Sequence, residues 1–140
     1  MAQLFTFVLN HWTLWLALIV IMGVLIKMEL ANTVRGITLL SPQQVVDAMN
    51  RESALVMDVR NSQAFAKGHI LGAINIAKDE LSEQNARLEP HKAKPVIVTD
   101  NNGQQLINTA TKLRKLGFSN VRALRGGMVA WQNANLPLAK

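Results

Sequence analysis

Residues 96–110, VIVTDNNGQQLINTA, have the order of a buried strand, a glycine-containing turn and the start of a helix. Such a turn directs several backbone N–H groups toward one point, which is where many enzymes bind an anion. Asp100 ends the strand, so its carboxylate is expected at the mouth of this cradle. We interpret Asp100 as an internal anion that satisfies the turn; the alternative is that it simply caps the following helix or points to water.

The residue inventory excludes several other kinds of chemistry. The chain has no cysteine, which removes disulfides, thiolate metal sites and a cysteine nucleophile. His11, His69 and His91 are widely separated and lack metal-ligand spacing, so we expect no metal and no cofactor. An aspartyl-phosphate role for Asp100 needs further carboxylates for Mg²⁺, and the sequence places only Asp58 near it.

The elements that position Asp100 alternate between strand and helix. Predicted strands cover 36–40, 54–59, 73–76, 95–100 and 120–124, and predicted helices cover 42–50, 62–68, 78–88, 104–116 and 126–134. This alternation predicts an α/β fold, with a central parallel sheet flanked by helices. Asp58 and Asp100 each end a strand, so both are expected at the carboxyl edge, where such sheets have their working crevice.

An uncharged, apolar run over residues 4–26 precedes this domain. As a helix it would span roughly 34 Å, at ~1.5 Å per residue, against a hydrocarbon core of about 30 Å. A signal peptide would need a basic start and a cleavage site, and neither is present; a buried globular helix is the remaining alternative. We predict a single-pass transmembrane helix over 1–26, a linker over 27–35 and one domain over 36–140.

The formal net charge of +6 lies entirely after residue 26. Lys27 and Arg35 follow the apolar run, so the positive-inside rule predicts an N-terminus outside and a domain in the cytoplasm, at a bacterial inner membrane. Basic residues over 112–125 form either a solvated face or a contact for anionic lipid or an acidic partner. The domain has no recognisable nucleic-acid motif, so we expect the lipid bilayer and other membrane proteins as partners, not nucleic acid.

Two separated segments resemble signatures of the rhodanese family. Residues 57–76, MDVRNSQAFAKGHILGAINI, resemble its Asp-x-Arg and Gly-His-Ile-x-Gly-Ala-x-Asn motifs, and residues 113–131, LRKLGFSNVRALRGGMVAW, resemble its C-terminal motif. The resemblance covers about residues 36–138 and implies a single rhodanese-like domain. We assign structural roles to the motif residues, which are Asp58, Arg60, Gly68, His69, Gly72, Gly126, Gly127 and Trp131.

The resemblance also implies where sulfur chemistry would occur. Rhodanese enzymes carry sulfane sulfur on a cysteine, in a loop of pattern Cys-x-x-Gly-x-Arg that precedes a helix. On this chain the pattern places Asp100 at the cysteine, Gly103 at the glycine and Gln105 at the arginine. A carboxylate cannot form a persulfide, and at about 4 Å it would repel an anionic donor by roughly 4 kcal/mol. We therefore predict a degenerate loop, made of Asp100, Asn101, Asn102, Gly103, Gln104 and Gln105.

Together these features predict a catalytically inactive, membrane-anchored module that works by protein interaction or as a scaffold. It would act at the inner face of the membrane, close to the bilayer because the predicted linker is short. The alternative is a sulfurtransferase or sulfur carrier that works with the cysteine of a partner protein.

Overall fold

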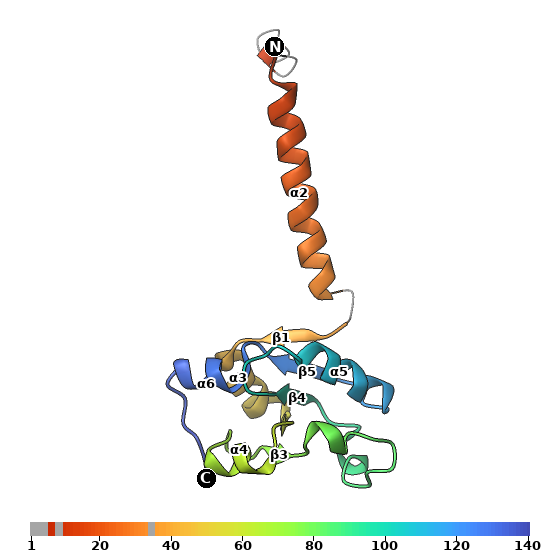
Figure 1. Ribbon diagram of the computed structural model, residues 1–140, viewed down its shortest axis with the longest axis vertical. Helices are drawn as coiled ribbons and strands as arrows, with labels where there is room; N and C mark the ends of the chain where they lie inside the picture. Colours follow the sequence, from red (N-terminus) through yellow and green to blue (C-terminus); the bar gives the residue numbers. More distant parts are fainter. Residues whose placement is uncertain (1–5, 8–9, 34–35) are drawn as a thin grey trace. The chain divides into compact units, whose positions relative to one another are not determined.

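The chain divides into two compact units, Met1–Gly36 and Ile37–Lys140. The computed structural model describes residues 6–7, 10–33 and 36–140 (Figure 1). The second unit is a layered α/β domain, and it contains every strand in the described part of the chain.

The first unit is built on the helix α2 (Trp12–Thr33). Most of its residues are apolar, and the side chains from Trp12 to Met28 are exposed around the whole helix. Within the described ranges, no helix combines the length and the hydrophobicity required for a membrane span. The membrane helix expected over 1–26 stays a prediction, and its residues 1–5 and 8–9 lie outside the described residues.

The helix α2 continues beyond the apolar run. Residues 27–33, expected in a linker, are helical. The Lys, Met, Glu, Leu and Ala residues of this stretch have high helix propensity, so the helix does not end where the apolar residues end. The last two positions of the expected linker, 34–35, lie outside the described residues.

The second unit contains a five-stranded sheet with the order β1-β5-β4-β2-β3 (Figure 1). Each pair of neighbouring strands is parallel, which confirms the predicted α/β fold with a central parallel sheet. All four residues of β4 are buried, as expected for a strand that is covered on both faces. The strands are β1 (Thr38–Leu40), β2 (Leu55–Asp58), β3 (Ile74–Asn75), β4 (Val96–Thr99) and β5 (Val121–Leu124).

Helices cover the two faces of the sheet and form two apolar layers. The helices of this unit are α3 (Pro42–Glu52), α4 (Ser62–Lys67), α5 (Leu106–Lys115) and α6 (Gly127–Asn133). Val96 and Val98 of β4 pack in one layer with α5, whereas Ile97 packs in the other with α3 and α6. The alternation of these three side chains fixes which helices lie on which face.

The segment 78–88 does not form the predicted helix. It begins with the 3₁₀ turn η1 (Lys78–Glu80) and continues through irregular turns to a second 3₁₀ turn, η2 (Glu89–His91). Leu81 and Leu88 are nevertheless both buried in the layer that contains α5. The apolar pattern therefore located two core residues correctly but gave the wrong backbone conformation.

Asn85 explains why this segment is irregular. Its side-chain oxygen accepts a hydrogen bond from the Arg87 N–H at 3.0 Å, and its amide nitrogen donates to the Glu80 carbonyl at 2.9 Å. Such side-chain bonds to nearby backbone groups compete with the regular hydrogen bonds of a helix. The turn is thereby stabilised by a residue of low helix propensity.

A buried ion pair follows the end of β2. Asp58 is 0% exposed, and its carboxylate accepts hydrogen bonds from Nε and Nη2 of Arg60, the latter at 2.6 Å. The Arg60 Nη2 also donates to the Gly68 carbonyl at 2.8 Å, and the Asn75 side chain donates to the carbonyls of Asp58 and Arg60. This network ties β2, α4 and β3 together at the carboxyl edge of the sheet.

Replacing Arg60 by alanine leaves the buried Asp58 carboxylate without its partner. We expect Arg60→Ala to lower the free energy of unfolding by about 3–5 kcal/mol, measured by urea denaturation of the full chain in detergent micelles. Arg87→Ala is the matched control, because the side chains of Arg87 and its partner Glu80 are 60% and 51% exposed. Losing that surface pair should cost about 1 kcal/mol or less, and similar losses in both variants would contradict the assigned role of burial.

Candidate functional site

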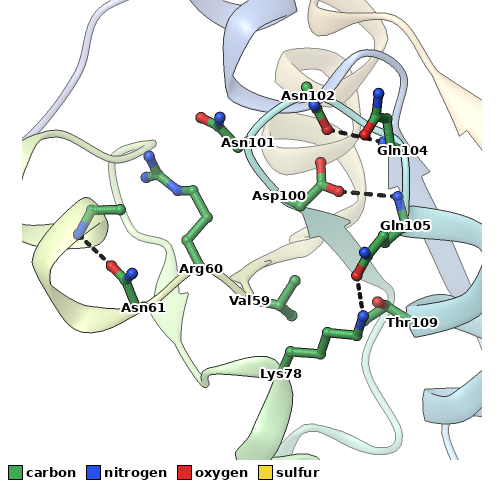
Figure 2. Close-up of a pocket in the computed structure, with 11 residues that line it drawn as sticks. Val59, Arg60, Asn61, Lys78, Asp100, Asn101, Asn102, Gln104, Gln105 and Thr109 are labelled. Carbon is green, nitrogen blue, oxygen red and sulfur yellow. Dashed lines mark hydrogen bonds between the residues drawn. The ribbon is translucent and has the colours of Figure 1, made fainter.

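A pocket of about 440 Å³ opens at the carboxyl edge of the sheet (Figure 2). Its walls come from residues 59–61 after β2, from Lys78 after β3 and from most of the loop 100–105 after β4. The structure thus brings the predicted loop residues together with Arg60, one of the predicted motif residues. Because all strands run in the same direction, these segments meet at one edge although they are distant in sequence.

The Asp100 carboxylate is hydrogen-bonded to its own loop. Oδ1 accepts from the Gly103 N–H at 2.5 Å, and Oδ2 accepts from the Gln105 N–H at 3.4 Å. The Asn102 side-chain oxygen accepts from the Gln104 N–H at 3.2 Å. Figure 2 shows Asp100 turned toward Gln105 at the base of the loop. The N–H groups of Gly103 and Gln105 therefore meet an anion that belongs to the chain itself.

These N–H groups come from the loop and not from the first turn of the helix. The helix α5 begins at Leu106, two residues after the predicted start at 104. Gln105 is the residue that precedes it, and no side chain caps this helix. The alternative interpretation of Asp100 as a simple helix cap is therefore wrong, since its stronger hydrogen bond is to Gly103, inside the turn.

The loop 100–105 packs against the start of α6, where Gly126 and Gly127 lie. The N–H groups of Met128 and Val129 donate to the carbonyls of Asp100 and Asn101 at 2.8 and 3.0 Å. A Cβ on Gly127 would lie 2.6 Å from the Asp100 Oδ1, which is too close for any side chain. The φ angle of Gly127 is +60°, which also favours glycine. Gly127 is thus required by close contact with the carboxylate, whereas a Cβ on Gly126 would lie 2.7 Å from the Ala130 Cβ.

Lys78 lines the pocket and brings a positive charge to it. This residue was not among those predicted from the sequence. Its Nζ donates a hydrogen bond to the Gln105 side-chain oxygen, where the family pattern has an arginine (Figure 2). Arg60 also lines the pocket, but its guanidinium group is engaged by Asp58. The only signal for Lys78 is its position shortly after β3, at the same edge as Asp58 and Asp100.

The remaining motif residues lie outside the pocket lining and make structural contacts. The His69 ring stacks on Phe65 with 3.8 Å between ring centroids, and its Nδ1 donates to the Phe65 carbonyl at 2.9 Å. Trp131 is buried, and its Nε1 donates to the Pro137 carbonyl at 3.1 Å. Gly72 occupies a turn with φ at +79°. In the described part of the chain, no three His, Asp or Glu side chains gather closely enough to bind a metal ion.

The parallel sheet and the glycine-supported loop after β4 define a rhodanese-like domain. The family model described as a rhodanese-like domain matches residues 41–134, and the chain belongs to this family. The match includes both segments that carry the sequence motifs and the whole of the loop 100–105.

The chain is also similar to individual proteins of known sequence or structure. Over its full length the chain is 38% identical to the uncharacterized protein YibN of Escherichia coli (strain K12), covering 99% of that protein. It is 34% identical to the thiosulfate sulfurtransferase GlpE of Pseudomonas entomophila (strain L48), over 67% of this chain and 84% of the relative. The crystal structure of the BH2092 protein from Bacillus halodurans shares the fold, with a TM-score of 0.67 and 22% identity, over 81% of this chain and 84% of that one.

Neutralising Asp100 removes the charge from its hydrogen bonds to the loop. Asp100→Asn is expected to lower stability by about 1–2 kcal/mol, which corresponds to a fall in Tm of roughly 5–10 °C. Asp79→Asn is the matched control, because Asp79 is exposed at the same edge of the sheet. An unchanged Tm in Asp100→Asn would contradict the role of Asp100 as the anion of the loop.

Adding a methyl group to Gly127 tests the close contact with the carboxylate. Gly127→Ala is expected to lower the free energy of unfolding by about 3 kcal/mol or more, because strain at positive φ and a steric clash with Asp100 add together. Gly72→Ala has the same kind of strain but meets no atom within 4 Å, so it should lose about 1 kcal/mol. Chemical denaturation compares the two variants, and equal losses would show that the clash with Asp100 is relieved.

Proposed function

We propose that this chain is a membrane-anchored rhodanese-like domain that binds other proteins and carries out no sulfur transfer of its own. The observation that carries the proposal is the Asp100 carboxylate, which accepts hydrogen bonds from the loop N–H groups of Gly103 and Gln105. An anionic sulfur donor in this loop would be repelled by that charge. The chain also has no thiol on which a sulfane sulfur could be held.

Anchoring is proposed through the apolar run over residues 4–26. The run has no charged residue, and the side chains of α2 from Trp12 to Met28 are exposed, which suits contact with lipid. The positions of Lys27 and Arg35 favour an N-terminus outside and a domain at the inner face of the cytoplasmic membrane. Membrane proteins are therefore the partners that this location favours.

The pocket supports a role in binding. The amide side chains of Asn101, Asn102 and Gln104 surround its opening and are exposed, so they offer both donors and acceptors. A concave site with several such groups suits a polar peptide segment of a partner protein. The Asp100 carboxylate at its base occupies the position that an anionic ligand would otherwise take.

A second candidate function is sulfur transfer with the cysteine of a partner protein. Relatives described as thiosulfate sulfurtransferases match two thirds of the chain, and Lys78 supplies a cation next to Gln105. A persulfide on a partner would then be bound by the pocket, and the chain itself would not carry the sulfur. The two functions differ in whether adding the partner produces sulfur transfer.

The absence of sulfur transfer is tested with thiosulfate and cyanide. The purified wild-type chain is expected to form no thiocyanate above background, because Asp100 can neither bind the donor nor hold sulfur. The double variant Asp100→Cys with Gln105→Arg restores the two side chains of the family pattern, and mass spectrometry is expected to detect its persulfide. Thiocyanate production by the wild type alone would contradict the proposal, and production only with a partner present would favour the second candidate.

Binding through the pocket is tested by photo-crosslinking in cells. A photoreactive residue replacing Gln104 is expected to give discrete adducts with membrane proteins, because this side chain borders the pocket. The control site is Asn50, which is exposed on α3. Adducts of the same pattern and yield at both sites would contradict specific recognition by the pocket.

A further inference from the structure

The amino ends of the strands form a second edge of the sheet, opposite the pocket. Thr38 at the start of β1 pairs in register with Arg122 of β5, while Val96 of β4 pairs with both Val121 and Leu55. The chain that follows α2 enters the domain at this edge, because β1 is the first strand. The edge is therefore the part of the domain closest along the chain to the proposed membrane anchor.

Basic residues from two separate segments gather at this edge. The helix α5 runs back from the pocket, so its last turn brings Lys112, Arg114 and Lys115 to the amino ends of the strands. The loop before β4 contributes Lys92 and Lys94. These five residues are called the amino-edge basic cluster below.

Contacts between the two segments hold the cluster together. The Ser119 N–H and hydroxyl both donate to the Lys92 carbonyl, at 3.4 Å. Gly117, which follows α5, lies against the Lys92 side chain, since a Cβ there would be 3.6 Å from the Lys92 Cδ. The charge of Lys92 is partly offset by Glu89 at 2.5 Å. Lys94, Lys112 and Lys115 are exposed.

The surroundings of the cluster contain further titratable groups. Burial and the positive charge of Lys94 both lower the pKa of His91, which precedes the cluster. The acidic residues Asp79, Glu80 and Glu83 instead follow β3, near the carboxyl edge. The amino edge thus carries the exposed lysines of the cluster, whereas the carboxyl edge carries these three carboxylates together with Lys78 and Arg125.

The structure divides the basic surface that the sequence suggested over 112–125. Arg122 forms an ion pair with Glu52, and its side chain is only 16% exposed. Arg125 follows the end of β5, so it lies at the carboxyl edge. The exposed lysines of the amino edge are therefore Lys112 and Lys115 of α5 and Lys94 of the loop before β4.

We propose that the amino-edge basic cluster binds the anionic headgroups of the membrane surface and so orients the domain. This inference rests on the proposed anchoring through α2, because only residues 34–37 join that helix to β1. A tether this short keeps the cluster within reach of an anionic leaflet, where each lysine strengthens binding roughly fivefold. Docking by this edge would direct the pocket away from the lipid, toward partners.

The absence of native cysteines allows a clean test on the full chain. A fluorophore on Ser119→Cys reports the amino edge, and one on Gln104→Cys reports the pocket. Each protein is reconstituted into vesicles of phosphatidylcholine, with or without phosphatidylglycerol, that contain a nitroxide headgroup quencher. We expect strong quenching at position 119 only in the anionic vesicles and weak quenching at position 104 in both.

Two triple variants with the same net charge distinguish binding by the cluster from a general effect of net charge. The test variant is expected to lower the ratio of docked to undocked domain roughly 100-fold, since three lysines are lost. Its substitutions are Lys94→Gln, Lys112→Gln and Lys115→Gln. The control removes the same charge elsewhere and should change the ratio less than about threefold, since it leaves the cluster intact. Its substitutions are Lys67→Gln, Arg125→Gln and Lys140→Gln.

Three outcomes would overturn the inference. They are equal effects of the two triple variants, equal quenching at both label positions, and no quenching at position 119 in anionic vesicles. Flotation of the vesicles after alkaline extraction tests the anchor separately. A chain that floats but is not quenched refutes the headgroup contact alone, whereas a chain that does not float refutes the anchor on which the contact rests.

Discussion

The hydrogen bond from the Gly103 N–H to the Asp100 carboxylate is the interaction on which the character of the pocket depends. It fixes the turn after β4, and the same oxygen lies against Gly127 at the start of α6. The loop, the carboxylate and the Gly-Gly pair are therefore one packed unit. A change in any of them alters the others, which is why a loop without the family's nucleophile still has a defined shape.

The loop after β4 keeps the glycine of the family pattern, while an aspartate stands at the position of its cysteine. The family pattern has a cysteine at this position, and here the loop N–H groups of Gly103 and Gln105 donate to a carboxylate. Lys78 takes a position next to Gln105, so a cation reaches this side of the pocket from another segment. The site therefore remains polar and concave, with charges of both signs, but without a group able to carry sulfur.

Much of the fold follows from local sequence signals. The strand β4 is recognisable from its continuous β-branched residues, and the helix predicted over 42–50 begins at a capping box of Ser41 and Gln44. Two features could not be predicted from the sequence. The turns around Asn85 replace a helix whose apolar spacing was correct, because side-chain hydrogen bonds to the backbone decide the conformation. Lys78 reaches the pocket only because β3 ends beside β2, a contact that no local pattern reveals.

The residue at the strand end also determines how the pocket responds to its chemical environment. A cysteine there would pass through sulfenic and sulfinic acids when peroxide is present, and each step would change its size, charge and hydrogen bonding. The Asp100 carboxylate has no such oxidation states. The carboxylate consequently keeps the same size, charge and hydrogen bonding whether peroxide is present or absent.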